Sequence, residues 1–165
     1  MPKDKNIETE FLSRIHKHQG ILHKICFLYS NYNADREDLY QEITLQLWKS
    51  YPSFKGESEF STWMYRVALN TAISITKKPS FFVAADNAPT IQDNIENSMD
   101  LNEEIKVLYK AISQLKKVEK AIVLLWLEEK SYEEIASTIG ITVKNVSVKL
   151  VRVKAKLAEI IKKLQ

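Results

Sequence analysis

The chain has little glycine, proline or cysteine: its 165 residues include three Gly, four Pro and one Cys, Cys26. A single cysteine cannot form an internal disulfide, so a disulfide-stapled scaffold is excluded. Residues 1–10 are too polar for a signal peptide, and no apolar run approaches the ~20 residues that cross a bilayer. We therefore expect a cytoplasmic protein without membrane insertion.

Scarce glycine and proline also favour helices, because these two residues interrupt helices most strongly. The chain is rich in Leu, Ile, Lys and Glu, and few of its segments alternate between apolar and polar residues. The sequence therefore predicts an all-α fold.

Charge is distributed unevenly along the chain. Residues 1–78 hold 11 Lys and Arg against 9 Asp and Glu, residues 79–104 hold none against 6, and residues 105–165 hold 13 against 6. The acidic stretch also holds two of the four prolines and many Asn, Asp and Ser residues, a composition typical of a linker. We expect two small helical domains, 1–78 and 102–165, joined by a flexible acidic linker, 79–101.

The segment from Ser131 to Leu157 has the pattern of a helix-turn-helix. Ser131 can cap the first helix while Glu134 completes a capping box, and Gly140 permits the sharp turn. The second helix repeats apolar residues at helical spacing, and these are expected to face the core: Val146, Leu150, Val153 and Leu157. A basic and polar face remains for a DNA major groove. For this pattern alone, an ordinary amphipathic helix pair with a solvated basic face is the alternative.

The segment from Asp35 to Thr76 predicts two more helices, with Asp35 as the N-cap of the first. In that helix one face is apolar (Leu39, Tyr40, Ile43 and Leu47) and another is acidic and polar (Asp38, Gln41, Glu42 and Leu45). The second helix is rich in aromatic residues. We expect its Trp63 to be mostly buried, since an aromatic row at helical spacing is more often core than a stacking surface.

Taken in order, these segments resemble the bacterial RNA polymerase sigma factors of the extracytoplasmic-function (ECF) type, members of the sigma-70 family. The resemblance rests on DLYQE, on SFKGESEFSTWMYRVALNTA and on SYEEIASTIGIT followed by VSVKLVRVKAKL, and it covers about residues 8–160. It implies a sigma region 2 helical bundle in the first domain and a region 4 helix-turn-helix in the second. It also implies a protein that binds core RNA polymerase and directs promoter recognition and transcription initiation.

The resemblance assigns roles to residues of the first domain. The polymerase-docking positions correspond to Asp38, Gln41 and Glu42, whose alternative role is helix capping and solubility. Contacts to single-stranded DNA of the minus-ten element correspond to Lys55, Gly56, Glu57, Ser58, Arg66 and Asn70. The loop among these residues would receive a flipped base, whereas Lys55 and Arg66 would hold phosphates.

In the second domain the resemblance implies contacts to the duplex of the minus-thirty-five element. The corresponding positions are Lys144, Asn145, Ser147, Val148, Lys149, Val151 and Arg152. This chain has Ser147-Val148 where Arg-Ser is commoner, and Lys144-Asn145 where Gly-Thr is commoner, so arginine readout of guanine is weakened. We hypothesise that Val148 and Val151 contact thymine methyl groups; extra core packing is the alternative.

No cofactor, metal or enzymatic activity is expected. His16, His18 and His23 lie in the first predicted helix near Cys26, but their spacing is not that of a four-ligand metal site. The sequence also lacks a glycine-rich phosphate loop and a recognised catalytic set. The resemblance makes an anti-sigma factor an expected partner. Two other functions stay open: a stand-alone helix-turn-helix regulator, and a sigma-like interaction module without initiation activity.

Overall fold

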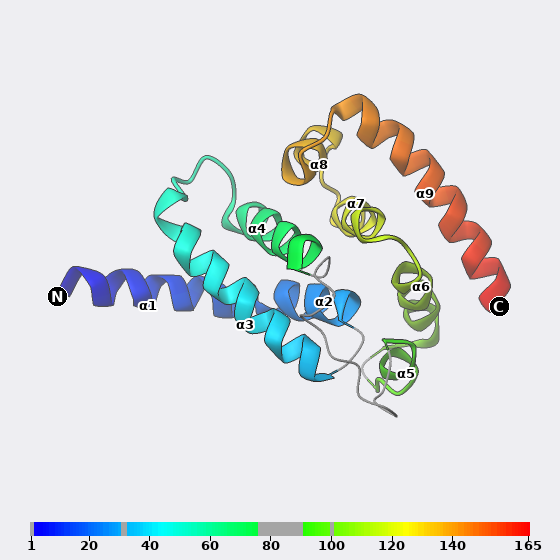
Figure 1. The fold of residues 1–165 in the computed structure, drawn as a ribbon, viewed down its shortest axis with the longest axis horizontal. Helices are drawn as coiled ribbons and strands as arrows, with labels where there is room; N and C mark the ends of the chain where they lie inside the picture. The colour runs from blue at the N-terminus through cyan, green and yellow to red at the C-terminus, as the bar shows by residue number, and fades with distance from the viewer. Residues whose placement is uncertain (1, 31–32, 76–90, 100) are drawn as a thin grey trace.

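The computed structural model describes residues 2–30, 33–75, 91–99 and 101–165, and within these ranges the regular structure is helical, without strands. The prediction of an all-α fold is confirmed. The helices follow one another as shown in Figure 1: α1 (Pro2–Lys17), α2 (Gln19–Tyr29), α3 (Asn33–Ser50), the 3-10 turn η1 (Tyr51–Ser53), α4 (Phe60–Ile75), α5 (Ile91–Glu96), α6 (Glu103–Ser113), α7 (Lys117–Leu127), α8 (Tyr132–Ile139) and α9 (Val143–Leu164).

The N-terminal helices pack around α3, which contacts both α2 and α4. Of its predicted apolar face, Leu39, Ile43 and Leu47 are fully buried, whereas Tyr40 is half-buried. The prediction that Asp35 is the N-cap is wrong, because α3 already begins at Asn33. Asp35 lies inside the first turn and is only 5% exposed, and this burial, with Asp38 nearby, raises the pKa of its carboxyl group.

The C-terminal helices contain the predicted helix-turn-helix. The backbone N–H of Glu134 donates to Ser131 Oγ at 3.1 Å, and the Glu134 carboxylate accepts from the Ser131 N–H at 3.4 Å, so the capping box is confirmed. Gly140 has φ +83°, in the left-handed region where glycine carries no steric cost. The four predicted core residues of α9 are buried: Val146, Leu150, Val153 and Leu157.

Helix α7 lies at the centre of the molecule. Its residues from Lys120 to Leu125 are all buried. This burial arises because α7 contacts α8 and α9 on one side and α4 of the N-terminal helices on the other. A helix that is packed on every side is apolar on every side, except where a polar side chain finds a hydrogen-bond partner.

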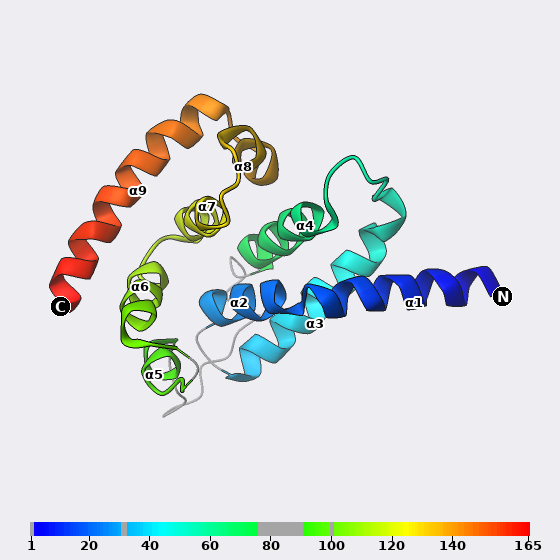
Figure 2. The same cartoon turned by 180° about the vertical axis from the view of Figure 1, so that it is seen from behind.

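The N-terminal and C-terminal helices lie against each other through α2 and α4 on one side and α6, α7 and α8 on the other. Figures 1 and 2 show that α9 runs along the outer edge of the C-terminal helices, away from α1 and α3. The outward face of α9 is therefore open to a partner in this arrangement.

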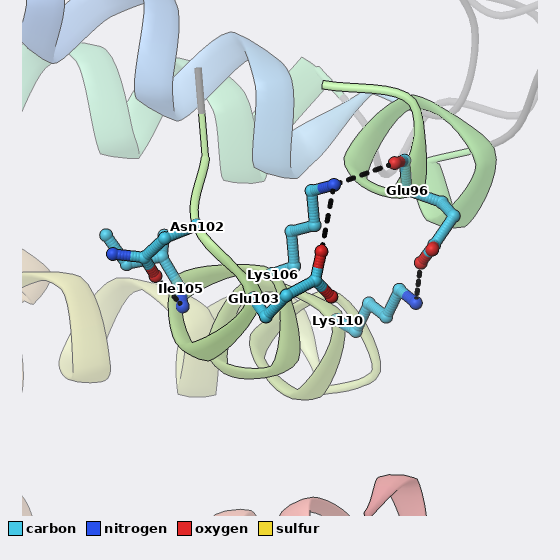
Figure 3. Close-up of polar contacts among 6 residues, drawn as sticks. All are labelled: Glu96, Asn102, Glu103, Ile105, Lys106 and Lys110. Atoms are coloured by element: carbon cyan, nitrogen blue, oxygen red, sulfur yellow. Dashed lines mark hydrogen bonds and ion pairs between the residues drawn. The ribbon is translucent and has the colours of Figure 1, made fainter. Parts of the chain in front are cut away.

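Residues 79–90 and 100 of the predicted linker, 79–101, lie outside the described residues, as do residues 76–78 of the predicted first domain. The described part contains α5, which packs on α6 with Ile95 fully buried. Figure 3 shows Lys106 Nζ donating to the main-chain oxygen of Glu96 at 3.1 Å, while Lys110 forms an ion pair with the Glu96 carboxylate. The cation at the C-terminal end of α5 also suits the dipole of that helix.

Candidate nucleic-acid and partner interfaces

The outward face of α3 carries the predicted polymerase-docking residues. Asp38 and Gln41 are exposed, whereas Glu42 is half-buried and accepts a hydrogen bond from Gln46 Nε2 at 3.0 Å. Their common face puts two carboxylates beside an amide, a combination that suits a basic partner.

An apolar depression of about 430 Å³ lies beside this acidic face, between α1 and α3. Its walls include Leu12, Leu45 and Trp48, each large, apolar and exposed, together with Gln41. The sequence pattern places Leu45 on the polar face of α3 and does not predict the contribution of α1. The docking face is thus mixed, with apolar surface next to negative charge.

A larger hollow of about 760 Å³ lies between α3, the loop that follows η1, and α4, and Glu42 of the docking set also lines it. Five of the six predicted minus-ten residues line it: Lys55, Glu57, Ser58, Arg66 and Asn70. The sixth, Gly56, has φ +75° and forms the turn of the loop, a conformation that side chains with a Cβ rarely adopt. The fold therefore brings two cationic side chains and several hydrogen-bonding groups to one cavity, next to the turn at Gly56.

Aromatic rings form one wall of this hollow. Trp63 is half-buried and lines the cavity with Phe54, whose ring centroid is 5.3 Å from that of Trp63. Behind them, the Arg14 guanidinium carbon lies 5.5 Å from the centroids of Phe54 and Phe60. Tyr65, in contrast, is buried in the core. Trp63 thus combines packing with an edge that reaches the cavity.

Asn70 is also engaged by the C-terminal helices. Its Nδ2 donates to the main-chain oxygen of Thr138 in α8 at 3.0 Å. One N–H of the amide group predicted to contact an unstacked base therefore bonds a protein acceptor, while the Asn70 side chain is exposed.

The outward face of α9 presents most of the predicted minus-thirty-five residues to solvent. Those that are exposed are Lys144, Asn145, Val148, Lys149, Val151 and Arg152, whereas Ser147 is half-buried. Val148 is 42% exposed and Val151 is 68% exposed, so neither side chain is part of the core. The Thr142 hydroxyl caps this helix by accepting from the Asn145 N–H at 3.1 Å, a cap that the sequence analysis did not identify although Thr is a favoured N-cap residue.

Two of the three histidines considered above, His18 and His23, pack on aromatic rings, whereas His16 is exposed. The His18 ring is 5.6 Å from Phe60, and the His23 ring stacks on Tyr40 at 5.1 Å. In the described ranges, no group of three or more His, Cys, Asp or Glu side chains is arranged to hold a metal ion. Across those same ranges, no helix has the length and hydropathy to span a membrane.

Comparison with known proteins relates both halves of the chain to one family. The model of sigma-70 region 2 matches residues 14–78, and the model of sigma-70 region 4 matches residues 105–157. An ECF RNA polymerase sigma-E factor of Escherichia coli (strain K12) is 33% identical over 147 residues, which cover 79% of this chain and 76% of the relative. The chain belongs to the ECF sigma factors of the sigma-70 family. This sigma factor binds core RNA polymerase and directs promoter recognition and transcription initiation.

Other relatives agree with this assignment. The ECF RNA polymerase sigma-E factor of Haemophilus influenzae is 31% identical over 145 residues, covering 78% of this sigma factor and 77% of the relative. The sigma factor RpoE of Bartonella quintana, solved with the anti-sigma factor NepR, shares the fold with a TM-score of 0.69, 18% identity and coverage of 93% and 97%. CnrH in complex with the cytosolic domain of CnrY gives a TM-score of 0.65, 19% identity and coverage of 94% and 90%.

Proposed function

We propose that this sigma factor reads its promoter with two separate surfaces while a third surface holds the polymerase. The observation that supports this division is that predicted minus-ten residues line one hollow on α4, whereas the predicted minus-thirty-five residues lie along the far edge on α9. The domain limits 1–78, 79–101 and 102–165 are part of this proposal.

The exposed face of α3 is the proposed polymerase-docking surface, with Asp38, Gln41 and Glu42 as its polar contacts. Asp38→Asn should weaken association with core polymerase, because it removes a carboxylate from a face that suits a basic partner. Glu37→Gln is the matched control, since Glu37 is also exposed in the same helix but lies outside the proposed set. Equal affinities of the two variants would contradict this surface.

The hollow on α4 is the proposed site for the opened minus-ten strand. In this proposal Glu57, Ser58 and Asn70 hydrogen-bond an extruded base that stacks against the aromatic wall, and Gly56 provides the turn. Lys55 and Arg66 hold phosphates, and their contribution is sequence-independent and sensitive to salt.

The face of α9 is the proposed reader of the minus-thirty-five duplex. Val148 and Val151 contact thymine methyl groups, while Lys144, Asn145 and Lys149 lie near flanking phosphates and Ser147 and Arg152 reach base edges. Val148→Ala and Val151→Ala should alter base preference at individual upstream positions. An unchanged preference at every position would reject methyl readout.

Lys149→Ala should act differently from the valine variants. Removal of a phosphate contact should lower affinity for all promoters alike and reduce the salt slope by about 1. The measurement is holoenzyme binding to a set of upstream variants over a range of salt concentrations. A loss confined to particular sequences would mean that Lys149 reads bases.

An anti-sigma factor is a proposed partner, supported by the structurally similar sigma factor RpoE of Bartonella quintana, which was solved with the anti-sigma factor NepR. We also propose that the protein works in the cytoplasm, has no enzymatic activity of its own and requires no cofactor or metal. It acts by positioning polymerase and DNA.

Run-off transcription reconstituted with core polymerase tests the whole proposal. Transcripts that depend on the added chain and start at a defined site are the expected result. Tight, specific duplex binding without polymerase would instead favour a stand-alone regulator. Binding to core polymerase without any transcript would favour an interaction module.

A further inference from the structure

A cation from α1 lies behind the aromatic wall of the hollow on α4. Arg14, in the last turn of α1, has its guanidinium carbon 5.5 Å from the ring centroids of Phe54 and Phe60 and 5.9 Å from that of Tyr51. Each distance is within the ~6 Å reach of a cation–π interaction. Because the three rings belong to η1, to the loop after η1 and to the start of α4, one guanidinium connects all three segments to α1.

The Arg14 guanidinium is itself oriented by a neighbour in α1. Its Nη2 lies 3.4 Å from Oε1 of Glu10, one turn earlier in the helix. The same carboxylate oxygen accepts a hydrogen bond from the Tyr51 hydroxyl at 2.5 Å. An ion pair between exposed groups contributes little to stability by itself. Here the shared carboxylate draws the guanidinium and the Tyr51 ring to the same place.

The influence of Arg14 reaches the hollow through two rings. Phe54 lines the hollow and contacts Arg14 directly. Phe60 lies one ring further back, with its centroid 5.4 Å from that of Trp63, which also lines the hollow. Aromatic pairs at such distances stabilise each other's position. Arg14 is not among the described residues that line the hollow, so it acts on the wall from behind.

The wall needs such support because part of it belongs to a loop. Residues 54–59 connect η1 to α4 and lie outside any helix. The loop ends are joined to their neighbours by two backbone hydrogen bonds, from Phe54 N–H to the Tyr51 oxygen at 3.0 Å and from Trp63 N–H to the Glu59 oxygen at 3.1 Å. If the rings are in place in only a fraction of the molecules, affinity for a base that stacks on them falls by that fraction.

We propose that Arg14 is a positioning residue of the minus-ten site, whose guanidinium holds Phe54 and, through Phe60, Trp63 where an extruded base stacks. The inference rests on the proposed function for the identity of the ligand. It adds a residue of the N-terminal helix to a site that the resemblance to sigma factors limits to residues 55–70. Since Arg14 acts on the rings, its contribution should depend on the base and not on salt.

Hydrogen exchange in the free full-length chain tests the positioning without DNA. Arg14→Met keeps a side chain of similar reach and removes the charge, whereas Lys17→Met removes the same charge from an exposed position of the same helix. Loss of the cation–π contacts should speed amide exchange of Phe54 and Trp63, followed by NMR, about fivefold in Arg14→Met. Lys17→Met should leave both rates unchanged. Equal rates in the two variants would overturn the positioning role.

Binding of holoenzyme to single-stranded oligonucleotides tests the consequence for DNA. The probes carry the non-template minus-ten sequence, either intact or with one base at a time replaced by an abasic site. Arg14→Met should bind the intact strand about fivefold more weakly than Lys17→Met, and the two should bind alike when the base that stacks in the hollow is missing. The salt slope should stay unchanged. A slope smaller by about 0.7, or an equal loss on every probe, would indicate a phosphate contact and overturn the proposal.

The same probes separate this inference from the proposed function. If the wild-type holoenzyme tolerates an abasic site at every minus-ten position, the proposed role of the hollow is wrong, and the inference is overturned with it. If one position matters to the wild type but Arg14→Met and Lys17→Met bind the intact strand alike, the role of the hollow stands and only the role of Arg14 is overturned.

Discussion

Lys120 differs from the other lysines of the described chain because its ammonium group lies inside the molecule. Burial, reinforced by the nearby charge of Lys117, lowers its pKa from 10.5 to about 8. The hydrogen bond that Lys120 Nζ donates to the main-chain oxygen of Leu28 offsets part of the cost of burying a charge but does not abolish it. The folded chain therefore releases this proton at a lower pH than the unfolded chain does.

This pKa predicts a pH dependence of stability with a definite sign. Below pH 8 the ammonium is charged in both the folded and the unfolded chain, and burying the charge lowers the free energy of unfolding. Between pH 8 and 10.5 the folded chain is deprotonated while the unfolded chain still holds the proton, so the free energy of unfolding rises with pH. Relative to Lys120→Met, wild type should gain about 2 kcal/mol between pH 7 and 9.5. Urea unfolding of both proteins at each pH measures the difference.

The comparison with Lys120→Met isolates the lysine from other groups. Burial raises the pKa of the Cys26 thiol to about 12, so deprotonation of this thiol favours the unfolded chain above pH 9. Tyr29, whose pKa is also raised by burial, acts in the same direction at higher pH. Both effects occur equally in the two proteins. A stability difference that stays constant with pH would contradict a buried ammonium at this position.

Glu129 adopts a backbone conformation that favours glycine. It has φ +60° at the turn between α7 and α8, where the Lys130 N–H donates to the main-chain oxygen of Leu125 at 3.1 Å. Glu129→Gly should raise the free energy of unfolding by roughly 0.5–1 kcal/mol, because the left-handed conformation strains a residue with a Cβ. Glu159→Gly, inside α9 and more than one turn from its end, should instead lower it by about 1 kcal/mol. Urea midpoints distinguish the two, and a loss of stability in both would remove the strain argument.

At the scale of elements, the helix-turn-helix was predictable because its signals are local. Ser131, Glu134 and Gly140 determine the ends of α8 through contacts within a few residues. The break between α1 and α2 at His18 was not predictable in this way, since the first segment reads as one amphipathic helix. The all-round burial of α7 was missed for a related reason: α4, which covers its second side, lies far away in the sequence.

In the candidate sites, too, the residues could be predicted from local sequence, whereas contacts between distant segments could not. The resemblance to sigma factors indicated Lys55, Arg66 and Asn70, and the fold brings them to one hollow. The bond from Asn70 to Thr138 could not be predicted, because it joins residues 68 positions apart and depends on how the regions dock. The apolar depression between α1 and α3 depends on helix packing for the same reason.

The N-cap of α9 carries a prediction for the recognition helix as a whole. Thr142→Ala removes the acceptor of the Asn145 N–H and should lower the free energy of unfolding by about 1 kcal/mol. The first turn of α9, with Lys144 and Asn145, should fray and weaken binding to the upstream duplex. Thr142→Ser keeps the acceptor and should retain both properties, as urea unfolding and holoenzyme binding would show. Equal effects of Ala and Ser would indicate that the cap is unimportant.

At the scale of the whole molecule, affinity for a promoter should depend on polymerase. Two weak contacts that are held at the right spacing gain strongly in effective concentration. Free sigma factor should therefore bind promoter DNA far more weakly than the holoenzyme does. Fluorescence anisotropy at one salt concentration, with and without core polymerase, measures the ratio. Similar affinities with and without core polymerase would show that the chain does not need polymerase to position its two DNA-binding surfaces.

The central position of α7 also determines how much change the sequence can accept. A residue there must satisfy neighbours from two folded halves simultaneously, so a replacement that suits one half will commonly disturb the other. A saturation library selected for transcription should thus record its lowest substitution tolerance between positions 120 and 125. Positions on the outer side of α9 should accept a far wider range of residues when selection demands only a folded protein.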